Sequence, residues 1–194
     1  VDSPFVVPKN MELTIAEGVT IDLVDSAFIV SYSPVKIIGT ASNSVTIKSS
    51  DGTGQGLAVI SADGLSEVTH VRFENQSSIA RRFWNLTGGV TFYDSPLAMR
   101  NVEFDGFDSE DALNIVSSSF FLEGVRIVNC RSYALDLDFS VGKIEGITLI
   151  NPGNDGLDLS GSHVTVSGGH ILNAGDKGVS IGEDSVLVLL KSLI

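Results

Sequence analysis

The chain has 194 residues, of which 24 are acidic and 12 are basic, so its formal net charge is −12. Apolar residues make up 43% of it, which excludes intrinsic disorder because enough apolar surface is available to offset the loss of chain entropy. No window of roughly 18 residues lacks charges and turn residues, and no basic stripe is present. The sequence therefore predicts neither a membrane span nor nucleic-acid binding.

Residues 1–76 predict short, irregular strands between turns. Apolar residues alternate with polar ones over a few positions at a time, which is typical of half-buried strands. The predicted strands are Met11–Ile15, Ile21–Leu23, Phe28–Val30, Val35–Ile37, Val45–Ile47, Leu57–Val59 and Val68–Phe73. We expect the segment before them, Asp2–Lys9, to cover the amino end of the fold.

Residues 77–89 break this pattern and predict an inserted loop. The loop contains a basic-aromatic cluster, Arg81-Arg82-Phe83-Trp84. One interpretation is that Arg81 and Arg82 bind a sugar carboxylate while Trp84 stacks on a sugar ring. The other is structural, with the loop folded over the wall of the domain and its aromatic side chains sealing it.

Residues 90–194 form regular repeats, with a period of 22 over most of their length. Two apolar columns recur at this spacing: Leu113, Leu135, Leu157 and Val179, and Ile115, Leu137, Leu159 and Ile181. An asparagine column follows at Asn129, Asn151 and Asn173. Repeats of this length with strand periodicity and no helix predict an all-β, right-handed parallel β-helix. We expect about eight coils and a rod about 40 Å long, since coils stack about 4.8 Å apart.

The three parts predict one domain over residues 1–194, with irregular coils over 1–76 and regular coils over 90–194. Its carboxyl end is the apolar strand Val186–Leu190. Because a bare strand edge invites pairing, we expect further coils, a neighbouring domain or end-to-end self-association to cover it.

The repeat length, the alternating strands and the asparagine column resemble the pectin-lyase-like right-handed β-helix superfamily, which includes pectate lyases, polygalacturonases and phage tailspikes. The segments GGVTFYDSP, SEDALNIV and GDKGVSIGE are also similar to β-helix regions beside spore-coat-kinase-type or lamin-tail domains of bacterial surface proteins. These resemblances imply an extracellular or cell-surface protein with polysaccharide as a partner.

A local resemblance concerns the polygalacturonases, which carry acidic motifs on successive coils. Gly153-Asn154-Asp155-Gly156-Leu157-Asp158 resembles the first motif and Gly175-Asp176-Lys177-Gly178-Val179 the second. The resemblance implies catalytic positions at Asp155 and Asp176. Gly153 stands where that family has Asn and Lys177 where it has its second Asp, and the later Gly-His-Gly and Arg-x-Lys motifs are absent.

Strand alternation places further acidic residues on the outer face. Asp136 points outward because Leu135 and Leu137 point inward, and Asp138 and Asp158 share its face. Carboxylates stacked at coil spacing repel each other, so something must offset the repulsion.

Three explanations of the acidic face remain open. The first is a cation such as Ca²⁺, bound by Asp136, Asp138 and Asp158. The second is a proton held between carboxyls, which would create an acid and a base. The third is a solvated face that is screened by salt and keeps the domain soluble.

The sequence therefore predicts a non-catalytic extracellular β-helix domain that binds or presents to polysaccharide. In that reading the predicted binding residues are Asp136, Arg81, Arg82, Trp84 and Lys177. The alternative is a polysaccharide lyase or glycoside hydrolase that acts on an acidic glycan. Its predicted catalytic residues are Asp155, Asp158 and Asp176. A second alternative is a structural or adhesin stalk.

Overall fold

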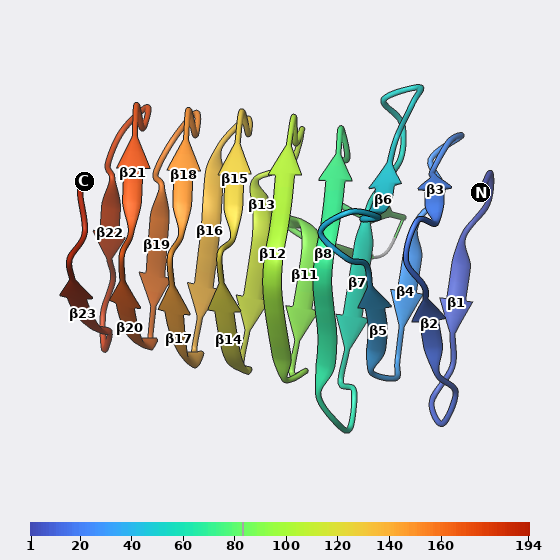
Figure 1. Cartoon of the computed structure of the whole chain (residues 1–194), viewed down its shortest axis with the longest axis horizontal. Coiled ribbons are helices and arrows are strands. Elements are labelled where there is room, and N and C mark those ends of the chain that lie inside the picture. Colours follow the sequence, from blue (N-terminus) through green and yellow to red (C-terminus); the bar gives the residue numbers. More distant parts are fainter. Residues whose placement is uncertain (83) are drawn as a thin grey trace.

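The computed structural model of the chain describes residues 1–82 and 84–194, which form strands and no helix. About eight turns stack along one axis, about 23 residues apart, and Figure 1 shows the amino and carboxyl termini at opposite ends of the stack. The predicted all-β parallel β-helix and its number of coils are confirmed. Within the described ranges no segment is a helix long and apolar enough to cross a bilayer.

Two sheets run the length of the stack. The 8-stranded sheet has the order β1 (Phe5–Val7), β4 (Ile29–Ser31), β7 (Leu57–Ile60), β11 (Gly88–Tyr93), β13 (Asp111–Val116), β16 (Tyr133–Asp138), β19 (Leu157–Ser160) and β22 (Val179–Ile181). The main path of the 13-stranded sheet is β2 (Leu13–Ile15), β5 (Val35–Ile38), β8 (Ser66–Glu74), β12 (Leu97–Asp105), β14 (Ser119–Glu123), β17 (Val141–Glu145), β20 (His163–Ser167) and β23 (Val186–Leu190).

The remaining strands of the 13-stranded sheet form a shorter flank. They are β3 (Thr20–Asp22), β6 (Val45–Lys48), β15 (Arg126–Val128), β18 (Thr148–Ile150) and β21 (His170–Leu172). Each ladder in both large sheets is parallel, as expected when a strand pairs with its equivalent in the next coil.

The coil bends where the backbone enters the left-handed region. In one regular coil the bends lie at Ser117, Gly124 and Asn129, with φ angles of 49°, 61° and 53°. The equivalent residues one coil later, Phe139, Gly146 and Asn151, have φ angles of 50°, 68° and 54°. Glycine and asparagine tolerate this conformation, whereas a phenylalanine there is uncommon.

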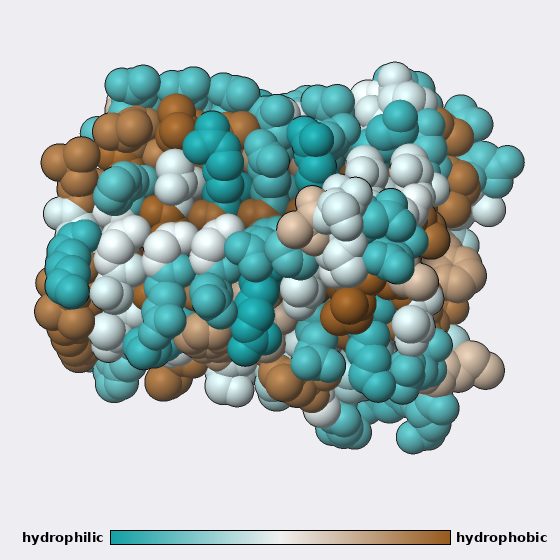
Figure 2. Space-filling view, viewed as in Figure 1, coloured by the Kyte–Doolittle hydropathy of each residue, from teal (hydrophilic) through white to brown (hydrophobic). Residues whose placement is uncertain are grey.

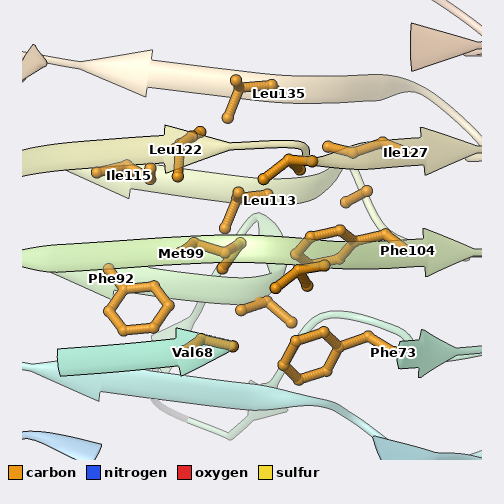
Figure 3. Close-up of a cluster of buried hydrophobic side chains, with 14 of the residues drawn as sticks. Val68, Phe73, Phe92, Met99, Phe104, Leu113, Ile115, Leu122, Ile127 and Leu135 are labelled. Atoms are coloured by element: carbon orange, nitrogen blue, oxygen red, sulfur yellow. The ribbon is translucent and has the colours of Figure 1, made fainter. Parts of the chain in front are cut away.

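The core consists of the inward columns that the repeat predicts. Leu113, Leu135 and Leu157 pair in register on β13, β16 and β19 and are at most 1% exposed. Aromatic residues fill the middle coils, where the Phe73 and Phe104 rings stack with centroids 5.1 Å apart (Figure 3). Removing these side chains from water is the main favourable contribution to the fold.

Two polar ladders tie successive coils together. The predicted asparagine ladder is confirmed: Asn173 donates to Asn151 over 3.1 Å, and Asn151 donates to Asn129 over 3.0 Å. A second ladder, of buried serines, lies at the corner between the two sheets. There the Ser118 N–H donates to Ser140 Oγ and the Ser140 N–H donates to Ser162 Oγ. These hydroxyls satisfy backbone donors that the bend turns away from carbonyl partners.

The predicted insertion is a small antiparallel hairpin, β9 (Ala80–Arg81) and β10 (Trp84–Asn85). It lies against the outer face of the 8-stranded sheet. Ile79 is fully buried there in an apolar cluster with Phe28, Val30 and Ala58. We call the described part of this insertion, residues 77–82 and 84–87, the flap.

The two ends of the stack differ from each other. The amino-terminal prediction was wrong in one respect, because residues within Asp2–Lys9 form β1, the first strand of the 8-stranded sheet, rather than a cover. At the other end β23 exposes apolar side chains, including Val186, Leu189 and Leu190. Figure 2 shows apolar atoms gathered at that end of the molecule.

Candidate functional site

One outward column of the 8-stranded sheet changes chemistry along the stack. In register it reads Val30, Ala58, Thr91, Asn114, Asp136, Asp158 and Ser180. Val30 and Ala58 are buried under the flap, whereas Asp136, Asp158 and Ser180 are partly exposed. Asp138 lies beside Asp136 on the same face of β16. We call Asp136, Asp138 and Asp158 the acid cluster.

The amide of Asn114 holds two members of the acid cluster. Its Nδ2 donates to Asp136 Oδ2 and to Asp138 Oδ2, each over 3.2 Å. The two carboxyl oxygens therefore lie no farther apart than twice that distance. This arrangement agrees with the sequence prediction that Asp136 and Asp138 share one outer face.

Asp111 lies next to the acid cluster and is 1% exposed. It pairs in register with Gly88 on β11, and a Cβ built on Gly88 would lie 2.9 Å from the Asn114 Cβ. The charge of Asp111 contributes to the raised pKa of Asp136, which indicates that the two carboxyls lie close together. Asp111 Oδ2 is buried without a hydrogen-bond partner among the described residues.

Crowding changes the protonation of two of these carboxyls. Burial, together with the charges of Asp111, Asp138 and Asp158, raises the pKa of Asp136 to about 8. Burial, together with the charges of Glu110, Asp138 and Asp158, raises the pKa of Asp111 to about 7. At neutral pH the group therefore retains protons that isolated aspartates would have released.

Aromatic side chains border the acid cluster on two sides. Tyr133 begins β16, and burial with the nearby charges of Asp155, Asp158 and Glu110 raises its pKa. Phe139 follows the end of β16 and is 68% exposed. Its ring lies over Gly161 of the next coil, where a Cβ would be 2.5 Å from the ring.

The two residues aligned with polygalacturonase motifs are held together by Lys177. Asp155 is 3% exposed, and its Oδ1 accepts the Lys177 backbone N–H over 2.8 Å. The Lys177 ammonium lies 3.7 Å from Asp155 Oδ2 and pairs more closely with the exposed Asp176. Hydrogen bonding to Asp176, with the charge of Asp155, raises the pKa of Lys177.

The basic-aromatic residues lie on the flap, away from the acid cluster. Arg81 donates to the Ser26 carbonyl over 3.0 Å, and its guanidinium lies 4.3 Å from the centroid of the Phe28 ring. Arg82 and Trp84 are exposed, whereas Phe83 lies outside the described residues. Phe28 is next to β4, which β7, β11 and β13 separate from β16. The structure therefore does not bring Arg81 to Asp136.

The sequence predicts Asp136, Asp138 and Asp158 as the ligands of a cation such as Ca²⁺. Among the residues that the structure describes, no group of three or more His, Cys, Asp or Glu side chains is arranged to hold a metal ion. Asp136, Asp138 and Asp158 share a face, and a cation bound to them stays a prediction.

A separate hollow lies on the 13-stranded sheet. Its lining is largely apolar and includes Leu65, Phe121 and Val141. The one charged side chain in that lining, Arg100, pairs with Glu123 over 3.2 Å. It therefore offers less chemistry than the acid cluster.

Asn114, Tyr133 and Phe139 were not predicted as functional residues, and Asp111 was not given a role. The 22-residue register contains the signal for Asn114, which stands one coil before Asp136. Asp111 and Tyr133 also pair in register. The sequence does not predict the left-handed conformation of Phe139, because the equivalent residues in the neighbouring coils are Ser117 and Gly161 and not aromatic residues.

No protein-family model matches the chain, and comparison with curated proteins and with solved structures found no significant match for it. The parallel β-helix architecture is established by the structure, and membership of the pectin-lyase-like superfamily remains part of the proposal below.

Proposed function

We propose that this domain binds polysaccharide on the outer face of β13, β16 and β19. The observation that carries the proposal is the open stretch of the 8-stranded sheet, where carboxyl and amide groups lie between Tyr133 and Phe139. Carboxylates and amides accept and donate hydrogen bonds to sugar hydroxyls, and aromatic rings supply apolar surface at a low entropic cost. This combination is typical of a site for a polyhydroxylated ligand.

The length of the site suits a chain rather than a single sugar. Phe139 follows Tyr133 by six positions along the strand, which span about 20 Å at about 3.3 Å per residue. Polysaccharides of walls and matrices lie outside cells, so an extracellular or cell-surface setting is part of the same proposal. Membership of the pectin-lyase-like superfamily would be consistent with it.

Affinity electrophoresis in gels that contain soluble polysaccharides tests the proposal. The panel should include neutral, uronate-containing and amino-sugar polymers. We expect at least one of them to retard the domain. The double variant Asp136→Asn/Asp158→Asn and the variant Tyr133→Ala should lose most of this retardation.

A matched control uses the double variant Glu123→Gln/Glu145→Gln, which removes the same charge from the 13-stranded sheet. Both carboxylates are on strands of the 13-stranded sheet, whereas β16 belongs to the 8-stranded sheet. The control should be retarded like the unmodified domain. Absence of retardation by every polymer, or equal loss in both double variants, would contradict the proposal.

Glycoside hydrolysis is the second candidate function. One observation favours it: the raised pKa of Asp136 beside Asp138, whose Oδ2 lies within twice 3.2 Å of Asp136 Oδ2. That limit falls short of the separation of about 6.5–9.5 Å in inverting enzymes but includes the 5–5.5 Å or so of retaining ones. Release of reducing ends from the polymer that binds, lost in Asp136→Asn, would support hydrolysis.

A further inference from the structure

The outer face of the 13-stranded sheet changes character toward its carboxyl end. As far as β17, its strands carry charged side chains, for example Arg100, which pairs with Glu123. The two strands that follow, β20 and β23, contain no Asp, Glu, Lys or Arg. This part of the face is therefore uncharged in a chain whose formal net charge is −12.

β23 departs from the alternation of its neighbour. β20 alternates regularly, with Val164 and Val166 buried and the residues between them turned outward. Because β23 pairs with β20 in register, its outward residues are Val186, Val188 and Leu190. They are 53%, 44% and 49% exposed. A strand that is apolar at every position is typical of one that is buried on both faces, and within the described part of the chain only the inward face of β23 is covered.

The apolar surface continues from β23 toward the middle of the sheet. Val141 on β17 is 60% exposed and pairs in register with His163, which pairs with Val186. Val141 also lines the largely apolar hollow beside Phe121. Apolar residues gather at the carboxyl end of the molecule in Figure 2. A contiguous exposed apolar patch marks an interaction surface, unlike apolar residues that are scattered singly.

The distribution of charge indicates which partner fits this patch. A strongly acidic or basic partner would find no opposite charge on β20 and β23. The charged residues on the strands of the 8-stranded sheet are all acidic, so two copies that met there would repel each other. Two copies that meet through β20 and β23 place uncharged surface on uncharged surface. A twofold pair also needs no second complementary patch, because each copy contributes the same one.

We propose that the outer faces of β20 and β23 pack against the same faces of a second copy of the chain, forming a dimer with twofold symmetry. The two sheets lie about 10 Å apart, as is usual when sheets pack face to face. Val186, Val188 and Leu190 form the centre of the contact. The contact uses a sheet face and not the backbone edge of β23, so it differs from end-to-end association. It also does not depend on polysaccharide binding.

Sedimentation velocity measurements over a range of concentrations test the proposal. At about pH 8, where histidine is mostly neutral, we expect a monomer near 1 μM or so and a dimer near about 100 μM. Raising the salt from about 0.1 M to about 1 M should not weaken the dimer, because apolar contacts are not screened as charges are.

A double variant tests the residues of the patch. Val186→Thr/Val188→Thr keeps the size and the strand preference of both side chains but replaces a methyl group with a hydroxyl group in each. It should raise the dissociation constant of the dimer at least about tenfold. The matched control is Val6→Thr/Val19→Thr, at positions that are 52% and 40% exposed near the other end of the stack. The control should form dimers like the unmodified chain.

Thr165→Glu distinguishes the face from the edge. Thr165 lies at the centre of β20 and points outward, and β23 separates it from the end of the sheet. In a face-to-face dimer the two added carboxylates would meet in the contact, so the dimer should be lost. Backbone pairing along the edge of β23 would not be affected. Circular dichroism and thermal unfolding check that every variant is folded.

Three results would overturn the inference. They are a monomer over the whole concentration range, a dimer that survives Thr165→Glu, and equal weakening in the two double-valine variants. Survival in Thr165→Glu would mean that the copies associate through the strand edge instead. None of these results changes the retardation expected in the polysaccharide gels, so the proposed function can stand where this inference fails.

Discussion

The covered and the open parts of the 8-stranded sheet differ on their outer face and not in their core. Under the flap the outward column holds Val30 and Ala58, which are 2% and 0% exposed. In the open part the same column holds Asp136 and Asp158. Inward residues such as Leu57 are buried equally in both parts. The inward columns therefore determine the fold, whereas the outward column takes the chemistry that its surroundings allow.

Coil length follows the same division. Open coils pair Leu113 with Leu135 and Leu135 with Leu157, at a constant spacing of 22. In the covered part Leu57 pairs with Val90, because the flap is inserted between them. An insertion at a corner leaves the register of the strands intact. The solenoid can thus carry an accessory element without disturbing its stack.

The largest expected effect is on the flap. Ile79→Ala removes a fully buried side chain from the cluster with Phe28, Val30 and Ala58. We expect a loss of about 2–5 kcal/mol in the free energy of unfolding, with the flap opening locally first. Urea unfolding measures the loss, and hydrogen exchange should show faster exchange in the flap than in β16.

The control for the flap is Leu65→Ala, which truncates an apolar side chain that is 51% exposed. Its effect should stay within about 0.5 kcal/mol. A loss for Ile79→Ala as small as that of the control would mean that the flap does not seal the outer face, and the division into covered and open parts would fail.

The next effect concerns the open part and depends on pH. Asp136 and Asp111 have pKa values raised to about 8 and about 7, well above those of unfolded aspartates. Between about pH 4 and about pH 8 the folded state therefore binds more protons than the unfolded state. Stability should fall as pH rises through this window, and it should be greatest on the acidic side.

Asp136→Asn removes the contribution of Asp136 to this dependence and leaves that of Asp111. We expect the variant to be more stable than the unmodified domain near pH 8, by an amount on the order of 2 kcal/mol, and nearly equal to it near pH 4. Thermal unfolding across the pH range measures both. Glu145→Gln, on the opposite sheet, should leave the pH profile unchanged. A stability of the unmodified domain that rises toward pH 8 would contradict the burial of these two carboxyls.

The fold could be predicted from the sequence because the residues that repeat are the ones that form the core. Leu135 and Leu137 point inward, and so do their equivalents in the next coil. The repeat period and the alternation of apolar and polar residues therefore suffice to identify them. Asn129 was also predicted, because a left-handed corner favours asparagine and its neighbours on the stack are the same residue type.

The candidate site could be predicted only in part. The alternation of β16 predicted that Asp136 and Asp138 face outward together. The orphaned oxygen of Asp111 was not predictable, because its burial depends on packing at a corner rather than on periodicity. The contact between Arg81 and the Phe28 ring was also not predictable, because the sequence pattern does not indicate in which direction an inserted loop folds back.

A smaller effect is expected from the serine ladder, which runs through the regular coils. Ser140→Ala leaves the buried Ser118 N–H without its acceptor. We expect a loss of roughly 1.5 kcal/mol in the free energy of unfolding, because a buried donor would go unpaired. Ser180→Ala, at a partly exposed position of β22, serves as the control and should change stability little. Similar losses in the two variants would show that the ladder adds nothing beyond surface polarity.

The smallest effect is a gain in stability that accompanies a loss of binding. Phe139 has a φ angle of 50° and is 68% exposed, so its side chain strains the corner while contributing little burial. Phe139→Gly should relieve that strain and add about 0.5–1 kcal/mol to the free energy of unfolding. Ser117→Gly is the matched control, because Ser117 occupies the same corner one coil earlier with a φ angle of 49°. Both variants should be slightly more stable by urea unfolding, but only Phe139→Gly should lose retardation in the polysaccharide gels. If binding survives in Phe139→Gly, the strained aromatic has no part in recognition, and the open coils bind through their polar groups alone.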